Sequence, residues 1–189
     1  MLSTNIFYGE LVHLTAEDPE TAGKALADWG RDTEYMRLED FGPMRLWSAK
    51  KIQAWRENGL ERSDQGVYYF GVRTIQEDRL IGFIHLVGTS WTHGDTWMGI
   101  GLGDREYWGK GYGTDAIRVI LRYAFTELNL RRVTLVVFAY NIRAIKSYQK
   151  AGFKVEGRLR QHLARDGQRN DMIVMGVLRE EWLQSVMNA

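Results

Sequence analysis

Three glycines at alternate positions, Gly109, Gly111 and Gly113, form the segment of this sequence with the clearest capacity for chemistry. The segment runs directly into a stretch with helical periodicity, so it forms a loop at the amino end of a helix. Glycine permits backbone conformations that other residues avoid, and the unpaired amides of a helix start favour an anion. The segment therefore predicts a phosphate- or pyrophosphate-binding loop, although a flexible turn explains three glycines equally well.

Two other nucleotide-binding motifs share features with this loop, and its context counts against both. Residues 111–116 fit the loose G-x-G-x-x-A pattern, which would indicate a nicotinamide-dinucleotide oxidoreductase. In that class the glycine turn follows its strand at once, whereas residues 104–108 intervene here, and the next strand ends at Asn141 instead of a ribose-binding acid. A P-loop needs serine or threonine after Gly-Lys, and Gly111 stands there.

A second glycine alternation precedes the loop. Gly99, Gly101 and Gly103 fall at every second position of a predicted strand, so one face of that strand carries no side chains. Such a face admits a ligand, a tightly packed helix or a β-bulge.

Three stretches of the sequence together resemble the GNAT family of acetyltransferases, and within it the ribosomal-protein and spermidine N-acetyltransferase-like branch. They are EYWGKGYGTDA at 106–116, NIRAIKSY at 141–148 and AGFKVEG at 151–157, and GELV at 9–12 is also similar. The resemblance extends over about residues 67–178. It implies the GNAT α/β fold, which has a mixed, mostly antiparallel central sheet with a splayed, bulged strand and flanking helices. It also implies transfer of the acetyl group of acetyl-CoA directly to a primary amine.

The same resemblance implies roles for individual residues. Tyr148 aligns with the tyrosine that protonates the departing CoA thiolate in many members, although a packed tyrosine with an idle hydroxyl also fits. Asn141 would bind the cofactor arm and cap a helix. The pantetheine arm would pair with the bulged strand where adjacent strands splay apart, and the glycine loop would hold the pyrophosphate. The cofactor-binding residues are thus Ile100, Gly101, Leu102, Trp108, Gly109, Lys110, Gly111, Tyr112, Gly113, Thr114 and Asn141.

The residue at the position of the general base differs from the one common in this branch. Its members often carry a glutamate two residues before the strand glycine, and that position is Trp97 here. His85, in the preceding predicted strand, is the remaining candidate for the base, although a lone strand histidine is more often structural. Because of this departure, a CoA-binding sensor without catalysis is an alternative function.

The acceptor amine is expected beside the loop at residues 31–43. Its acids Glu34, Glu39 and Asp40 could hold a cationic amine, although exposed acids commonly form only a solvated face. The aromatic candidates for a pocket wall are Trp29, Tyr35, Phe41 and Trp47. The sequence leaves open whether the acceptor is a small molecule, such as a polyamine, or a peptide amino terminus.

Hydrophobic periodicity predicts the elements that position these residues. We expect strands at 11–14, 67–72, 80–87, 96–102, 133–139, 153–159 and 171–178. We expect one helix that begins within residues 15–20 and runs to about 29, and further helices at 48–58, after the glycine loop and after Asn141. The strand at 133–139 is apolar enough to be buried on both faces. Between residues 30 and 43 the pattern is polar and broken.

Composition limits the class of protein. The sequence has 189 residues, 44% of them hydrophobic and 26% charged, which predicts one soluble domain over residues 1–189. A net charge of +1 gives no basis for a nucleic-acid partner. No apolar run approaches the roughly 20 residues of a membrane span, so we expect no membrane partner and a cytoplasmic location. The chain has no cysteine, which excludes thiol catalysis; we expect no metal site, and a homodimer is compatible with the sequence.

Overall fold

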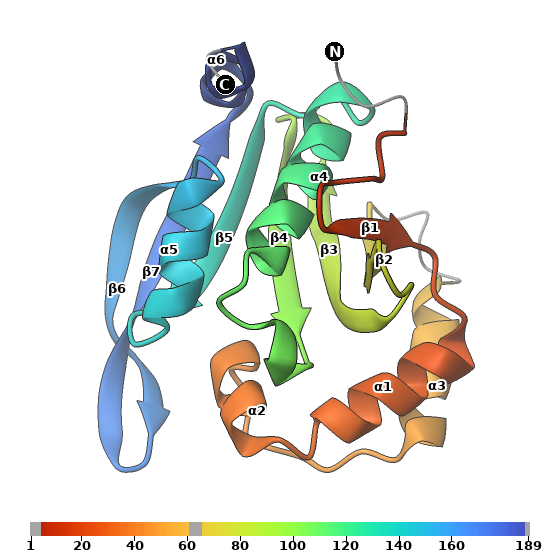
Figure 1. Cartoon of the computed structure of the whole chain (residues 1–189). Coiled ribbons are helices and arrows are strands. Elements are labelled where there is room, and N and C mark those ends of the chain that lie inside the picture. The colour runs from red at the N-terminus through yellow and green to blue at the C-terminus, as the bar shows by residue number, and fades with distance from the viewer. Residues whose placement is uncertain (1–4, 61–65, 188–189) are drawn as a thin grey trace.

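A seven-stranded sheet forms the centre of the protein in a computed structural model, which describes residues 5–60 and 66–187 (Figure 1). The strand order is β1-β2-β3-β4-β5-β7-β6, and every neighbouring pair is antiparallel except the parallel pair β4 and β5. The strands are β1 (Val12–Thr15), β2 (Tyr68–Thr74), β3 (Leu80–Ser90), β4 (Asp95–Leu102), β5 (Arg132–Phe138), β6 (Lys154–Arg165) and β7 (Gln168–Leu178). The mixed, mostly antiparallel sheet implied by the sequence is confirmed.

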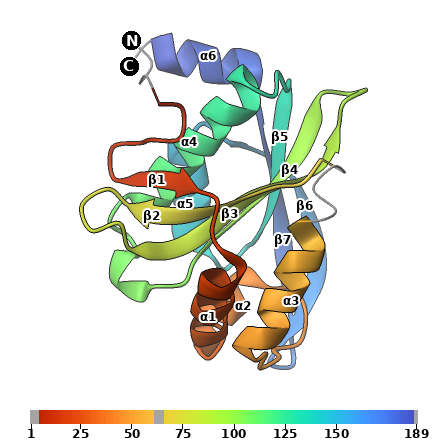
Figure 2. The same ribbon diagram turned by 90° about the vertical axis from the view of Figure 1, so that its right-hand side faces the viewer.

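Helices cover the sheet on both sides (Figure 2). They are α1 (Pro19–Trp29), α2 (Thr33–Glu39), α3 (Ala49–Leu60), α4 (Tyr112–Thr126), α5 (Ile142–Lys150) and α6 (Arg179–Met187). The helix expected after the glycine loop is α4, and it buries an apolar stripe against the sheet, with Ile117, Ile120 and Phe125 at most 1% exposed. Helices α1, α2 and α3 lie together on the other side, where Phe83 and His85 of β3 point. None of the helices in the described part of the chain has the length and hydrophobicity needed to cross a bilayer.

Strands β4 and β5 lie together only at their amino ends. Their ladder pairs Asp95, Thr96 and Trp97 with residues 132–134, and beyond this point the two strands diverge (Figure 1). The splayed strand is therefore confirmed. The bulge is not where the resemblance implied, because Ile100, Gly101 and Leu102 keep a regular register with β3. The register shift lies instead between Val87 and Ser90, where Gly88 has a φ of +63° that favours glycine.

Helix α2 corrects the prediction that residues 30–43 are irregular. Asp32 caps it, because its carboxylate accepts hydrogen bonds from the backbone N–H groups of Glu34 and Tyr35 at 2.9 and 3.2 Å. Arg105 pairs with Asp32 and holds that cap in place. The buried ring of Tyr35 anchors the helix. This short helix brings Glu39 to its carboxyl end.

The amino-terminal segment is attached to α4 by one buried carboxylate. Asp115, 6% exposed, accepts hydrogen bonds from the backbone N–H groups of Glu10, Leu11 and Val12 at 3.1, 2.7 and 3.0 Å. Gly9 lies so close to Asp115 that a Cβ would collide with the carboxylate. The GELV stretch and the aspartate after the glycine loop therefore fix β1 on α4.

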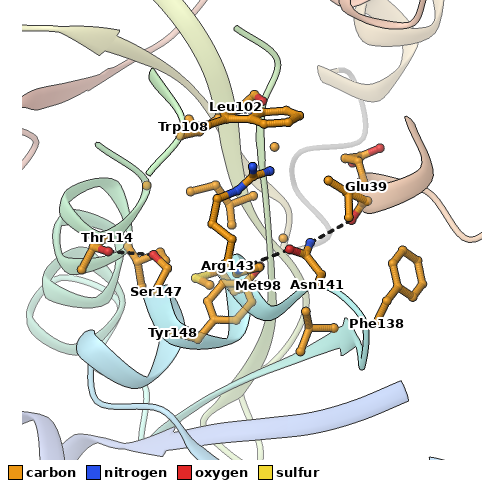
Figure 3. A pocket seen from close by; sticks show the side chains of 18 of the residues that line it. Glu39, Met98, Leu102, Trp108, Thr114, Phe138, Asn141, Arg143, Ser147 and Tyr148 are labelled. Carbon is orange, nitrogen blue, oxygen red and sulfur yellow. Dashed lines mark hydrogen bonds between the residues drawn. The ribbon is translucent and has the colours of Figure 1, made fainter. Parts of the chain in front are cut away.

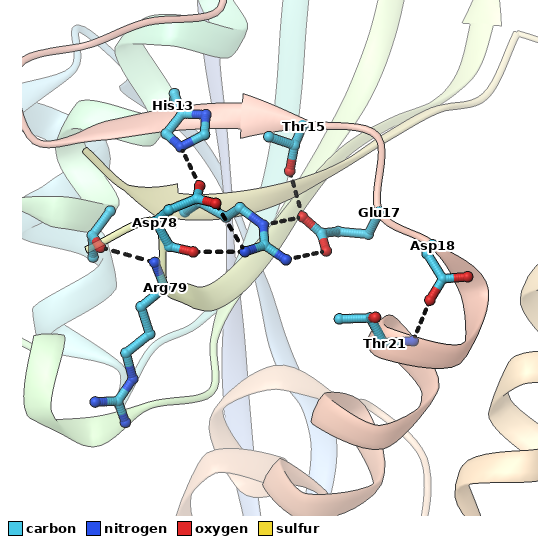
Figure 4. Close-up of polar contacts among 9 residues, drawn as sticks. His13, Thr15, Glu17, Asp18, Thr21, Asp78 and Arg79 are labelled. Carbon is cyan, nitrogen blue, oxygen red and sulfur yellow. Dashed lines mark hydrogen bonds and ion pairs between the residues drawn. The ribbon is translucent and has the colours of Figure 1, made fainter. Parts of the chain in front are cut away.

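A second carboxylate joins α1 to the sheet (Figure 4). Arg73 of β2 donates from Nε and Nη2 to the two oxygens of Glu17 at 2.6 and 2.8 Å, and the Glu17 side chain is 4% exposed. Burial alone would raise the pKa of Glu17, but the hydrogen bonds from Arg73 and Thr15 outweigh it and hold the pKa below its usual 4.5. Glu17 therefore stays ionised at neutral pH and fixes the chain just before α1.

Candidate active site

A cavity of about 790 Å³ fills the space between the separated strands (Figure 3). Its walls come from the carboxyl halves of β4 and β5, the glycine loop, α2 and α5. The β4–β5 ladder ends at Trp97, so in the described strands the edge formed by residues 98–102 faces this cavity. Backbone amides and carbonyls on such an edge can pair with an extended molecule that carries amide groups of its own.

The bare glycine face of β4 is packed against aromatic side chains of the protein itself. A Cβ on Gly99 would lie 2.5 Å from the His85 ring, one on Gly101 would lie 2.7 Å from Tyr35 Oη, and one on Gly103 would collide with Trp29. Close packing therefore accounts for the alternating glycines. The edge of β4, not its face, is open to the cavity.

The glycine loop has the conformation that its sequence predicts. Gly109 and Gly111 adopt φ values of +73° and +97°, which favour glycine, and Gly111 caps the amino end of α4. Five of the seven predicted loop residues line the cavity: Trp108, Gly109, Gly111, Gly113 and Thr114. The two others do not line it. Lys110 is exposed, and Tyr112 packs edge-on against Tyr107 with 4.9 Å between ring centroids.

Helices α4 and α5 are joined at the loop. Thr114 Oγ1 and Ser147 Oγ lie 2.7 Å apart, and Figure 3 shows this bond at one side of the cavity. Trp108 Nε1 donates to the carbonyl of Leu102 at 2.7 Å, which attaches the loop to the end of β4. These bonds fix the loop relative to both walls of the cavity.

Asn141 begins α5 as predicted. Its Oδ1 accepts from the Ala144 N–H at 3.2 Å, and its Nδ2 donates to the Leu38 carbonyl at 3.5 Å. The capping role is confirmed, and contact with a cofactor stays a prediction. The second bond also joins α5 to α2, so one residue connects the helix that carries Tyr148 with the helix that carries Glu39.

Tyr148 lines the cavity from α5 and is 8% exposed. Burial raises the pKa of its hydroxyl well above the usual value, and the nearby charge of Glu39 raises it further. The group is therefore protonated at every working pH. A protonated hydroxyl in this position can donate a proton to an anion formed in the cavity.

The charges of the cavity are separated between its two ends. Arg143, Lys146 and Lys150 line it from α5, and the Arg143 side chain extends toward Trp108. Glu39 and Asp40 line it from the end of α2, and Figure 3 shows Glu39 on the side opposite Thr114. The cavity can thus hold an anion at the glycine loop and a cation at α2.

The three predicted acids of the acceptor site divide into two groups. Glu39 and Asp40 line the cavity, and burial followed by the charge of Asp40 raises the pKa of Glu39 from 4.5 to about 7. Glu34 does not line it and forms an ion pair with Arg105 at 2.6 Å. Among the predicted aromatic walls, Tyr35 and Phe41 line this cavity, whereas Trp29 and Trp47 do not.

His85 lines the cavity but is poorly suited to take a proton from an ammonium. Its ring stacks on Tyr69 and Phe83, with centroids 5.2 and 5.9 Å away. Burial, together with the charge of Arg56, lowers the pKa of His85 to about 4. Its Nδ1 is buried without a hydrogen-bond partner among the described residues. The imidazole is thus neutral at pH 7 and weakly basic.

Trp97 also lines the cavity, so that position supplies no carboxylate.

Among the cavity residues that the sequence prediction missed are Arg143 and Ser147. Both lie in the NIRAIKSY stretch, four positions apart, and therefore on one face of α5. Their four-residue spacing in the sequence could have indicated that the two side chains lie on the same face of a helix.

Comparison with known proteins agrees with this geometry. A family model described as an acetyltransferase (GNAT) domain matches residues 10–154. The spermidine N(1)-acetyltransferase of Escherichia coli (strain K12) is 35% identical over 148 residues, which cover 74% of this chain and 76% of that protein. The probable N-acetyltransferase YjcK of Bacillus subtilis (strain 168) is 34% identical over 136 residues, or 70% of this chain and 71% of that protein.

The fold is also similar to that of a solved structure. The spermidine N-acetyltransferase from Vibrio cholerae, in complex with CoA and spermine, superposes with a TM-score of 0.80 at 24% identity, over 91% of this chain and 98% of that one. Because the family model covers most of the chain and the curated relatives exceed 30% identity, the chain belongs to the GNAT family, whose enzymes transfer the acetyl group of acetyl-CoA to amines.

Proposed function

We propose that this protein transfers the acetyl group of acetyl-CoA directly to a small primary amine that enters the cavity as an ammonium ion. One observation carries the proposal: a single cavity has basic side chains at the glycine loop, acidic side chains at the end of α2, and the Tyr148 hydroxyl in its wall. The phosphates of CoA suit the first end, and an ammonium suits the second.

The cofactor is expected to lie along the inner edge of β4. Its pyrophosphate would bind the loop amides between Trp108 and Thr114 together with Arg143, and its pantetheine amides would pair with residues 98–102 in place of a strand. Asn141, already a helix cap, would donate to the arm. The thioester would then lie deep in the cavity, within reach of Tyr148.

The transfer needs one acid and one base from the protein. Glu39 accepts a proton from the ammonium, and a pKa of about 7 suits a base at neutral pH. The amine nitrogen then bonds to the thioester carbon, the carbon–sulfur bond breaks, and the Tyr148 hydroxyl gives its proton to the sulfur. The nitrogen loses its second proton, which restores the Tyr148 hydroxyl, and the proton held by Glu39 passes to solvent, so a neutral amide and free CoA thiol leave. Glu39 replaces the strand glutamate that Trp97 displaces, and its pKa makes it a stronger base than His85.

A thermal-shift and turnover experiment tests the proposal. Acetyl-CoA is expected to raise the melting temperature, because it binds the folded state. Spermidine, named in the Escherichia coli relative, 2-phenylethylamine and a peptide with a free amino terminus are then supplied as acceptors. We expect release of free CoA thiol and an acetylated product, measured by mass spectrometry.

The experiment separates the alternatives. The absence of both a thermal shift and a calorimetric binding heat at saturating acetyl-CoA would overturn the proposal. Binding without CoA release for every acceptor would favour the CoA-binding sensor. Acetylation of the peptide alone would move the acceptor from a small molecule to a protein amino terminus.

A cytoplasmic location and a homodimeric state belong to the proposal as well. Cell fractionation tests the location, and sedimentation equilibrium at micromolar concentration tests the dimer.

A further inference from the structure

A second, smaller cavity adjoins the active-site cavity. It has a volume of about 190 Å³ and lies between α1, α2 and α3. Tyr35 and Glu39 line both spaces, so these two side chains form the wall that the cavities share. We call the smaller space the annex.

The lining of the annex is mostly apolar. Ala27, Met36, Ile52, Trp55 and Phe83 contribute to it. A cavity of about 150 Å³ lined by aliphatic and aromatic side chains is known to hold a benzene molecule, so the annex has room for one aromatic ring or a short alkyl group.

The charges of the annex argue against a second cation. Among the described residues that line it, Glu39 and Arg45 are the charged ones. If Glu39 holds the reacting ammonium, a second ammonium in the annex would lack a carboxylate and would share the space with the Arg45 guanidinium. Burying a cation without a partner is unfavourable, whereas burying an apolar group is favourable.

The Tyr35 hydroxyl lies in the wall shared by the two cavities. The residue is 4% exposed, and its hydroxyl is buried without a hydrogen-bond partner among the described residues. Buried polar groups of this kind normally have partners. A ligand that passes from one cavity to the other would place its polar end beside this hydroxyl and beside Glu39.

We propose that the annex binds the apolar tail of the acceptor, so that the preferred acceptor is a primary amine joined by a short linker to one aromatic ring or alkyl group, with no second charge. The inference rests on the proposed function, since Glu39 must hold the amine. It narrows the acceptor to a class different from the polyamines.

The first test compares acceptors. The kcat/KM for 2-phenylethylamine is expected to exceed that for spermidine by at least tenfold. Ala27→Leu, which fills the annex, should lower kcat/KM for 2-phenylethylamine at least tenfold and leave that for ethylamine, which lacks the tail, within about twofold. Ala22→Leu is the matched control, because Ala22 is also buried on α1 but does not line the annex.

A second pair of variants avoids the risk of misfolding. Trp55, 64% exposed, forms part of the annex wall, whereas Trp91, 59% exposed, lies outside both cavities. Trp55→Ala should raise KM for 2-phenylethylamine several-fold, and Trp91→Ala should leave it unchanged. Melting temperatures of all four variants show whether each one is folded.

The outcomes separate this inference from the proposed function. A higher kcat/KM for spermidine than for 2-phenylethylamine would overturn the proposal about the annex but leave acetyl transfer intact. An equal loss of kcat/KM for ethylamine and 2-phenylethylamine in Ala27→Leu would do the same. If no amine is acetylated, the proposed function fails, and calorimetry of 2-phenylethylamine with the CoA-saturated protein decides the annex. If 2-phenylethylamine binds and Ala27→Leu weakens that binding at least tenfold, the proposal about the annex is supported. If 2-phenylethylamine does not bind, the proposal is overturned.

Discussion

The guanidinium carbon of Arg143 lies 3.8 Å from the centroid of the Trp108 ring, so a residue of α5 reaches across the cavity to the glycine loop. Figure 3 shows the Arg143 side chain between these two walls. A cation over an indole face at this distance is attracted to the ring. The stack holds a positive charge beside the loop amides before any anion arrives.

Arg143→Ala is therefore expected to weaken acetyl-CoA binding by about tenfold or more. A hydrogen bond to a charged group contributes about 1.5–3 kcal/mol, and 1.4 kcal/mol corresponds to a factor of ten. Calorimetry at two salt concentrations should also show a smaller salt dependence in the variant. Arg118→Ala, an exposed arginine on α4 outside the cavity, is the control. Equal affinity in both variants would place the phosphates elsewhere.

Tyr148→Phe should lower kcat and leave the affinity for acetyl-CoA unchanged. The hydroxyl acts only when the thiolate leaves, and general acid catalysis is worth about 100-fold or more. Pre-steady-state turnover isolates the chemical step. Tyr123→Phe changes a partly buried tyrosine of α4 that does not line the cavity and should behave as wild type. A normal chemical rate in Tyr148→Phe would assign the proton to another donor.

Glu39 sets the expected acid limb of the pH profile. Its carboxylate forms only as the pH rises through about 7, so kcat/KM should fall about tenfold per pH unit well below that value. Glu39→Gln should lose most of the activity and the limb with it. A wild-type profile that is flat between pH 5 and 8 would exclude Glu39 as the base.

The same substitution is expected to stabilise the folded protein without substrate. Because burial raises the pKa of Glu39 above 4.5, the folded state binds this proton more tightly than the unfolded chain. That stabilisation is fully present below pH 4.5 and is lost as the pH rises through 7. At pH 8 the wild type must bury an ionised carboxylate, so Glu39→Gln should be more stable by about 3 kcal/mol, measured by urea unfolding. No difference at pH 8 would contradict the raised pKa.

Asp115→Asn should destabilise the protein by about 3 kcal/mol, because an amide oxygen replaces a carboxylate that accepts three backbone hydrogen bonds. Thermal unfolding should show a decrease of about 8 °C. Asp28→Asn, whose side chain is exposed on α1, should change little. Gly9→Ala should resemble Asp115→Asn, because its Cβ would meet the same carboxylate.

The sequence predicted those parts of the site that local patterns encode. The glycine loop, the Asn141 cap and Tyr148 lie within short motifs, and the strands and long helices follow from periodicity. Helix α2 could not be predicted in this way, because its capping residue Asp32 is held by Arg105, which is 73 positions away.

The division between the acids depends on distant contacts as well. Glu34 and Glu39 look alike in the sequence, yet Arg105 pairs with the first. The second lines the cavity beside Leu38, whose carbonyl accepts a hydrogen bond from the distant Asn141. The alternating glycines of β4 were ambiguous for a similar reason. Only the positions of His85, Tyr35 and Trp29 show that protein side chains fill that face.

The separation of β4 from β5 also bears on solubility. A strand edge with free backbone groups attracts other strands and promotes aggregation, and proteins usually protect such edges with charge, bulges or covering segments. Here residues 98–102 of β4 line a cavity whose other walls come partly from α2 and α5, so these helices flank the strand edge. The strand edge is thus open to a slender ligand, whereas the flanking helices hinder its pairing with a strand of another polypeptide.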